Sequence, residues 1–184
     1  MAKTEIRLSG FGGQGLITAG IILAEAAILD GKNAVQSQSY GPEARGGASK
    51  AEVIVSDGEI DYPKVGEADL LLAMSQQAAD KYAAAIHPDG IMVVDTDHVK
   101  QVPAFTGKTY RIPITHIAVE ETGKDLVANI VALGVIVGLT GLVSRAALET
   151  AVLDRVPPKT KELNKQALAA GFRAAEQVLN QGGE

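Results

Sequence analysis

Two glycine-rich segments contain the residues of this chain that are best suited to chemistry. The first, Ser9 to Gly15, reads SGFGGQG and lies between a short apolar run and a long apolar segment that ends at Leu29. A strand, a glycine turn and a helix in that order can cradle a phosphate, because backbone N–H groups and the helix dipole point at the turn. The spacing of Gly10, Gly12 and Gly15 also fits the dinucleotide fingerprint. Nucleotide binding is therefore the first hypothesis for this segment.

The dinucleotide hypothesis requires an acidic residue at the end of the second strand, where it would hold the ribose hydroxyls. That strand ends at Gln36 to Ser39 (QSQS), without an acid or an arginine. No Lys-Ser/Thr pair follows the glycines either, which excludes a Walker-type P-loop. The alternative is structural, since glycines allow a tight turn and a close approach of helix to strand. Gln14, exposed at the helix start, would then have no role of its own. The density of glycine in this turn still favours close approach by a ligand or by another polypeptide.

The second segment, Tyr40 to Gly47, reads YGPEARGG and has the composition of a loop. We expect it to leave the same sheet edge as the glycine turn, because both segments follow the carboxyl end of a strand. Ligands bind at that edge in open α/β sheets. Arg45 suits a phosphate or a carboxylate. A solvated ion pair between Arg45 and Glu43, which would contribute little, is the equally supported alternative.

Composition limits the remaining possibilities. The 184 residues are 46% hydrophobic and 21% charged, which is typical of a folded globular protein. The net charge of −5 argues against nucleic-acid binding. The chain has no cysteine and therefore no disulfide, cysteine-ligated cluster or thiol nucleophile. His87, His98 and His116 show no metal-ligand spacing, so no metal site is expected.

No signal peptide is recognisable, and a cytoplasmic location is expected. The apolar stretch from Leu126 to Val143 is interpreted as a buried helix rather than a membrane span.

Alternating patterns predict an α/β fold with a mostly parallel sheet. Strands are expected at 4–9, 34–39, 49–56, 68–74, 91–95 and 109–112, and helices at 13–29, 75–86, 114–121, 124–140, 144–153 and 161–180. Asp57-Gly58 predicts an antiparallel hairpin that returns over Glu59 to Tyr62. We expect residues 1–180 to form a single three-layer domain with helices on both faces of the sheet, and 181–184 to form a frayed tail.

The combined motifs resemble the gamma subunits of the 2-oxoacid:ferredoxin oxidoreductases. The resemblance rests on GFGGQG (10–15), SYGPEARGG (39–47) and DGEIDYP (57–63), together with Asn129, Leu133-Gly134, Asn164 and Ala167. It extends over almost the whole chain, and the first two motifs together are highly specific. It implies a fold like domain III of pyruvate:ferredoxin oxidoreductase. A short, separate chain that starts in this way is most similar to the 2-oxoglutarate branch, while pyruvate, branched-chain 2-oxoacids and indolepyruvate stay open as substrates.

The resemblance also implies how the work is divided among subunits. In this family, alpha and beta subunits hold thiamine diphosphate, and the beta or a delta subunit holds iron–sulfur clusters. The complex converts a 2-oxoacid and coenzyme A to acyl-CoA and carbon dioxide and reduces ferredoxin. The gamma chain by itself would hold no cofactor, metal or catalytic residue, and cofactors bound elsewhere would perform the difficult chemistry.

We therefore expect this chain to supply an edge for subunit docking and for covering the coenzyme. The residues expected to form this edge are Gly10, Gly12, Gly13, Gln14, Gly15, Ser39, Tyr40, Gly41, Glu43, Arg45, Gly46, Gly47 and Asn129. A stand-alone NAD- or FAD-binding module and a purely structural subunit are the alternatives. No membrane or nucleic-acid partner is expected, and the isolated chain, with its partner surface uncovered, is a candidate for homodimer formation.

Overall fold

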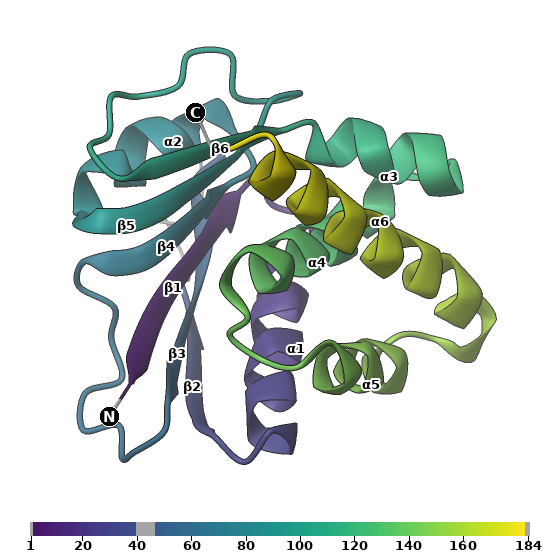
Figure 1. Ribbon diagram of the computed structural model, residues 1–184, viewed down its shortest axis with the longest axis horizontal. Coiled ribbons are helices and arrows are strands. Elements are labelled where there is room, and N and C mark those ends of the chain that lie inside the picture. The colour runs from purple at the N-terminus through teal and green to yellow at the C-terminus, as the bar shows by residue number, and fades with distance from the viewer. Residues whose placement is uncertain (1, 40–46, 183–184) are drawn as a thin grey trace.

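A computed structural model describes residues 2–39 and 47–182, which form a mixed sheet flanked by helices (Figure 1). The strands are β1 (Lys3–Gly10), β2 (Asn33–Gln38), β3 (Ser49–Ser56), β4 (Ala68–Ala73), β5 (Ile86–Asp95) and β6 (Lys108–Ile112). They lie in the order β2-β3-β1-β4-β5-β6. The four neighbouring strands β1, β4, β5 and β6 are parallel to one another, whereas β3 runs antiparallel to both β1 and β2. The expected α/β fold with a mostly parallel sheet is confirmed.

The helices cover the two faces of the sheet unequally. They are α1 (Leu16–Leu29), α2 (Gln76–Tyr82), α3 (Ile114–Thr122), α4 (Ala128–Thr140), α5 (Arg145–Arg155) and α6 (Lys161–Asn180). Strand residues alternate between the faces. Ile6, Leu8 and Leu72 join the larger core with α1, α4, α5 and α6. Leu71 and Val94 pack on the other face in the smaller core, which contains residues of α2. Helices thus lie on both faces, as expected.

The antiparallel element differs from the expected hairpin. No strand follows Asp57-Gly58 within the described segment 57–67, so the predicted return over Glu59 to Tyr62 is wrong. Strand β3 instead has two antiparallel neighbours, β1 and β2, and in its pairing with β2 Val35 lies opposite Ile54 and Gln38 opposite Ala51. Asp57 donates its backbone N–H to the carbonyl of Ala2, which directs the chain along the sheet rather than back against β3.

Several predicted element boundaries also change, among them the starts of α1 and β5. Helix α1 begins at Leu16 rather than Gly13, because Gly13 and Gly15 have left-handed φ angles of 88° and 75°. Strand β5 begins at Ile86 rather than at Ile91. Ile86 pairs with Ala68 and Ile91 with Leu70, so the residues between them bulge from the ladder.

Helix α4 is the buried helix that its sequence predicts. Every residue from Ala128 to Val137 is buried. It crosses α6 closely because both helices have a glycine at the contact: a methyl group on Gly134 would lie 2.6 Å from the carbonyl oxygen of Leu168, and one on Gly171 would lie 2.2 Å from that of Val131. Among the described residues, no helix is both long and apolar enough to span a bilayer.

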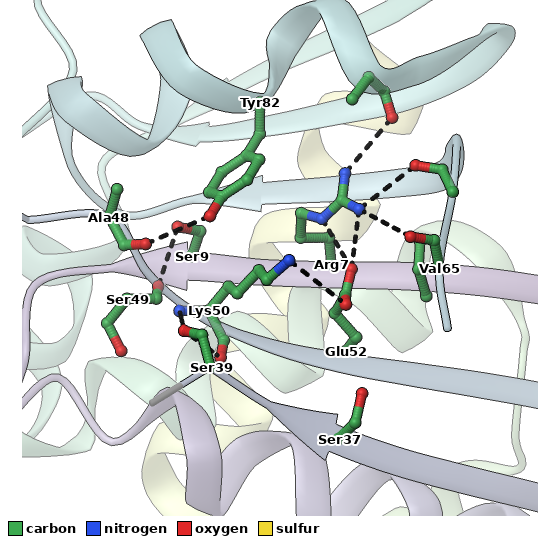
Figure 2. A network of polar contacts seen from close by, with 12 residues as sticks. Arg7, Ser9, Ser37, Ser39, Ala48, Ser49, Lys50, Glu52, Val65 and Tyr82 are labelled. Atoms are coloured by element: carbon green, nitrogen blue, oxygen red, sulfur yellow. Dashed lines mark hydrogen bonds and ion pairs between the residues drawn. The ribbon is translucent and has the colours of Figure 1, made fainter. Parts of the chain in front are cut away.

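A buried ion pair joins the strands on the face that α2 covers (Figure 2). Arg7 of β1 and Glu52 of β3 are 4% and 6% exposed, and Arg7 Nη2 lies 2.8 Å from Glu52 Oε2. Arg7 also donates to the carbonyls of Val65 and Gly66, at 3.1 and 3.3 Å. The guanidinium lies over the ring of Tyr82, 5.0 Å from its centroid. These partners compensate the burial of both charges and fasten the segment after β3 to the sheet.

Asp30 links the end of α1 to the start of α5. Its carboxylate accepts hydrogen bonds from the backbone N–H and, at 2.8 Å, from the hydroxyl of Ser144. The Ser144 hydroxyl oxygen in turn accepts from the N–H of Ala147 and caps α5. The hydrogen bond from the Ser144 N–H, followed by that from its hydroxyl, holds the pKa of Asp30 below its ordinary value of 3.8.

This link predicts an acid-dependent part of the stability. Because the folded pKa of Asp30 is depressed, its contribution is present above pH 3.8 and is lost as the pH falls through the folded pKa. In urea unfolding, Ser144→Ala should lower the free energy of unfolding at pH 7 by about 1 kcal/mol. Asp30→Asn should be less stable than wild type at pH 7, and this difference should narrow in acid. Asp154→Asn, at an exposed position of α5, is the control; a wild-type-to-D30N difference independent of pH would contradict the assignment.

Candidate functional site

The candidate site lies at the sheet edge where the parallel strands end. Gly10 at the end of β1 is opposite Ser49 at the start of β3, and Ser9 is level with Ala73 at the end of β4. Strand β1 continues into α1 on the face with the larger core, and β4 continues into α2 on the face with the smaller core. The crevice between two such strands is the usual ligand-binding position in open α/β sheets.

The side chain of Gln14 occupies this crevice. Its Oε1 accepts the N–H of Phe11 at 2.7 Å, and its Nε2 donates to the carbonyl of Met74 at 3.0 Å. A methyl group on Gly10 would lie 2.1 Å from Gln14 Oε1 and 2.8 Å from the Cβ of Met74. Gln14 is half-buried, so its expected exposure at the helix start is wrong. Its amide closes the glycine turn and joins the turn to the end of β4.

Asn129 holds the other side of the turn. It lies in the first turn of α4, is 8% exposed, and donates from Nδ2 to the carbonyl of Gly15 at 3.1 Å. A methyl group on Gly15 would lie 2.5 Å from this nitrogen. The structure thus brings together two predicted site residues that are 114 positions apart. Gly12 and Gly13, in contrast, have no heavy atom of the described residues within 4 Å of an added methyl group.

The flanks of the second glycine-rich segment lie at the same edge. Ser39 extends the pairing of β2 with β3, because its N–H donates to the carbonyl of Lys50 at 3.1 Å. Gly47 has a φ of 82°, and a methyl group on it would lie 2.9 Å from the ring of Phe11. The hydroxyl of Ser75, before α2, donates to the carbonyl of Gly47. Gly47 therefore contacts the glycine turn. Tyr40, Gly41, Glu43, Arg45 and Gly46 lie outside the described residues.

A third group at this edge was missed from the sequence. Asp95, at the end of β5, is fully buried. Its carboxylate accepts from Thr115 Oγ1 at 2.6 Å and is 2.9 Å from Nδ1 of His98. The ring of His98 meets that of Phe11 edge-on, with centroids 5.8 Å apart. The sequence signal for this group is a carboxylate at the end of a buried strand, followed by a histidine three residues later.

A cavity of about 180 Å³ lies between the glycine turn and this third group. Its walls come from Phe11 and Gln14 on one side and from His98, Thr115 and the residues before α4 on the other. The described residues contain no group of three or more His, Cys, Asp or Glu side chains placed to hold a metal ion. The described residues that line the cavity offer hydrogen-bonding groups and apolar contact.

Comparison with known proteins defines the class. The model of the pyruvate ferredoxin/flavodoxin oxidoreductase family matches residues 5–174, and the chain belongs to this family. It is 52% identical, over 179 residues and 96% of both chains, to 2-oxoglutarate synthase subunit KorC of Methanocaldococcus jannaschii.

Solved structures agree with this membership. The gamma subunit of a keto/oxoacid ferredoxin oxidoreductase from Geobacter sulfurreducens is 54% identical and superposes with a TM-score of 0.86, covering 95% of this chain and 99% of that one. The 2-oxoglutarate:ferredoxin oxidoreductase of Magnetococcus marinus, 22% identical with a TM-score of 0.84, has the same fold. There the match covers 96% of this chain but 32% of the longer one.

The Gln14 bridge predicts a local effect of charge. In Gln14→Glu, one carboxylate oxygen would face the carbonyl oxygen of Met74, so a hydrogen bond is replaced by repulsion. We expect the free energy of unfolding to fall by about 1–2 kcal/mol, and the amide of Phe11 to exchange faster with solvent. Urea unfolding and hydrogen exchange measure the two effects. Gln181→Glu, at the exposed end of α6, should change neither; equal stability of both variants would show that the bridge is dispensable.

Proposed function

We propose that this chain is the gamma subunit of a 2-oxoglutarate:ferredoxin oxidoreductase. The complex would convert 2-oxoglutarate and coenzyme A to succinyl-CoA and carbon dioxide, passing two electrons to ferredoxin. The observation that carries the proposal is the 52% identity to a 2-oxoglutarate synthase subunit over 96% of both chains. Thiamine diphosphate and iron–sulfur clusters would be held by alpha, beta and delta partners, in agreement with the absence of cysteine here.

The contribution of this chain would be the edge formed by the glycine turn and the second glycine-rich segment. Three contacts support this role: Gln14 and Asn129 fix the turn from both sides, and Gly47 packs against Phe11. Among residues 2–39 and 47–182, no side chain caps the start of α1 and no atom lies within 4 Å of a methyl group added to Gly12 or Gly13, which leaves space for close approach. We propose that partner subunits and coenzyme A meet the chain here. The match to only a third of the longer Magnetococcus marinus chain suggests that this fold works next to other domains.

The alternative of a stand-alone dinucleotide-binding module has less support. Strand β2 ends at Gln38 without an acidic residue, and the side chain of Gln14 fills the crevice at the glycine turn. Calorimetric titration of the chain with NAD, FAD and coenzyme A distinguishes the two functions, since tight binding of NAD or FAD would favour the alternative.

Reconstitution of the complex tests the proposed function. The chain should co-purify with its alpha, beta and delta partners. With coenzyme A, the complex should reduce ferredoxin faster with 2-oxoglutarate than with pyruvate, 2-oxoisovalerate or indolepyruvate. Preparations without this chain should lose most of the activity. A preference for another 2-oxoacid would refute the substrate assignment, and full activity without the chain would support a purely structural role.

A separate prediction concerns Arg45, to which we assign an anionic group of coenzyme A or a carboxylate of a partner subunit. Removing one charge-assisted hydrogen bond costs about 1.5–3 kcal/mol. Arg45→Ala should therefore raise the KM for coenzyme A, or weaken assembly, by at least about tenfold. Steady-state kinetics and size-exclusion chromatography of the complex measure the two effects. Arg111→Ala, at an exposed position of β6, is the matched control. If Arg45→Ala changed neither quantity, the assigned role would be wrong.

A further inference from the structure

The cluster of Asp95, His98 and Thr115 has the properties of a ligand-binding group. We propose that His98 presents a hydrogen-bonding nitrogen to the adjacent cavity and binds an uncharged, amide-bearing aliphatic arm there. The pantetheine arm of coenzyme A belongs to this chemical class. In this form the inference rests on the proposed function, which makes coenzyme A a substrate of the complex.

The first step concerns the orientation of the imidazole. The buried Asp95 carboxylate receives donors from several directions, among them Thr115 Oγ1 at 2.6 Å and the backbone N–H of Asp97 at 3.2 Å. His98 Nδ1 lies 2.9 Å from the same carboxylate, which selects the tautomer with the proton on Nδ1. Nε2 then carries a lone pair and has no hydrogen-bond partner among the described residues.

The second step concerns access. The His98 side chain is 35% exposed and lines the cavity of about 180 Å³. The contact with Phe11 and the bond to Asp95 hold the ring from two sides, so a ligand would meet an ordered nitrogen. Cavities of about 150 Å³ in proteins accommodate molecules the size of benzene. The cavity can therefore take part of an aliphatic arm but not a whole coenzyme A.

The third step concerns the chemical class of the ligand. No Lys or Arg occurs among the described residues that line the cavity, whereas the Asp125 carboxylate does. A phosphate would thus meet a negative charge without a compensating cation. Phe11 and Leu126, 39% and 71% exposed, offer apolar contact. An amide has a donor for neutral Nε2 and an acceptor for the protonated form, and its flanking methylenes suit the apolar walls.

Nuclear magnetic resonance can observe this nitrogen directly. The chain has only three histidines, so uniformly ¹⁵N-labelled, untagged protein gives a small set of imidazole signals. His98→Asn assigns the His98 signals. Pantetheine should shift the Nε2 resonance of His98, while the resonances of the exposed His87 and His116 should stay in place. Adenosine 3′,5′-bisphosphate, which has the phosphates but lacks the arm, should leave His98 unchanged.

Two variants separate binding from folding. An asparagine at position 98 can retain the donor toward Asp95 but lacks the distal nitrogen, so His98→Asn should weaken pantetheine binding by about two- to tenfold. His98→Gln places a polar atom near the distal position and should recover part of the loss. His116→Gln is the control. Chemical shifts of the backbone amides establish that each variant is folded.

Several outcomes would overturn the proposal. They are an unchanged His98 signal in 20 mM pantetheine, an equal response to adenosine 3′,5′-bisphosphate, and wild-type affinity in His98→Asn. In the reconstituted complex, His98→Asn should raise the KM for coenzyme A with little change in kcat or in the KM for 2-oxoglutarate. A wild-type complex without activity that depends on coenzyme A would refute the proposed function, while the binding result for the chain would still stand.

Discussion

The bridge formed by the Gln14 side chain is the contact on which the arrangement of the functional edge depends. One amide group satisfies the N–H of Phe11 and the carbonyl of Met74, and so connects the ends of β1 and β4 where their helices diverge to opposite faces. It also lies between these strand ends, where ligands usually bind in open α/β sheets. With this bridge in place, Gly10 must lack a side chain, and Phe11 is directed toward Gly47 and His98. The same bridge holds the turn against the end of β4.

Most of the fold follows from local patterns in the sequence. Apolar runs and their spacing predict all six strands and the six α-helices that the described residues contain. The hairpin after β3 could not be predicted correctly. Asp57-Gly58 carries a real turn signal, but its outcome depends on a long-range hydrogen bond to Ala2 and on the pairing of β2 with β3. Pairing between distant strands has no local signature.

The candidate site was predictable where a glycine indicates a left-handed backbone conformation. Gly15 and Gly47 do have left-handed conformations, and Asn129, which the family resemblance singled out, does meet Gly15. The partners of these residues were not predictable, because each comes from an element far away in the sequence: Met74 for Gln14, Ser75 for Gly47, and Phe11 for His98. The role of His98 was not predictable from the sequence for a related reason. Its chemistry comes from a buried carboxylate at the end of a strand, and burial of that carboxylate depends on helix α3 packing over it.

The crossing of α4 and α6 has a mechanical consequence for this edge. Where Gly134 and Gly171 meet, the backbone of one helix lies directly against that of the other. The two helices must therefore shift together as one unit. At one end of this unit, Asn129 donates a hydrogen bond to the carbonyl of Gly15. The other end includes the long exposed side of α6. A displacement of α6, far from the turn, would therefore reach the start of α1 through the backbone of the two helices and the side-chain amide of Asn129.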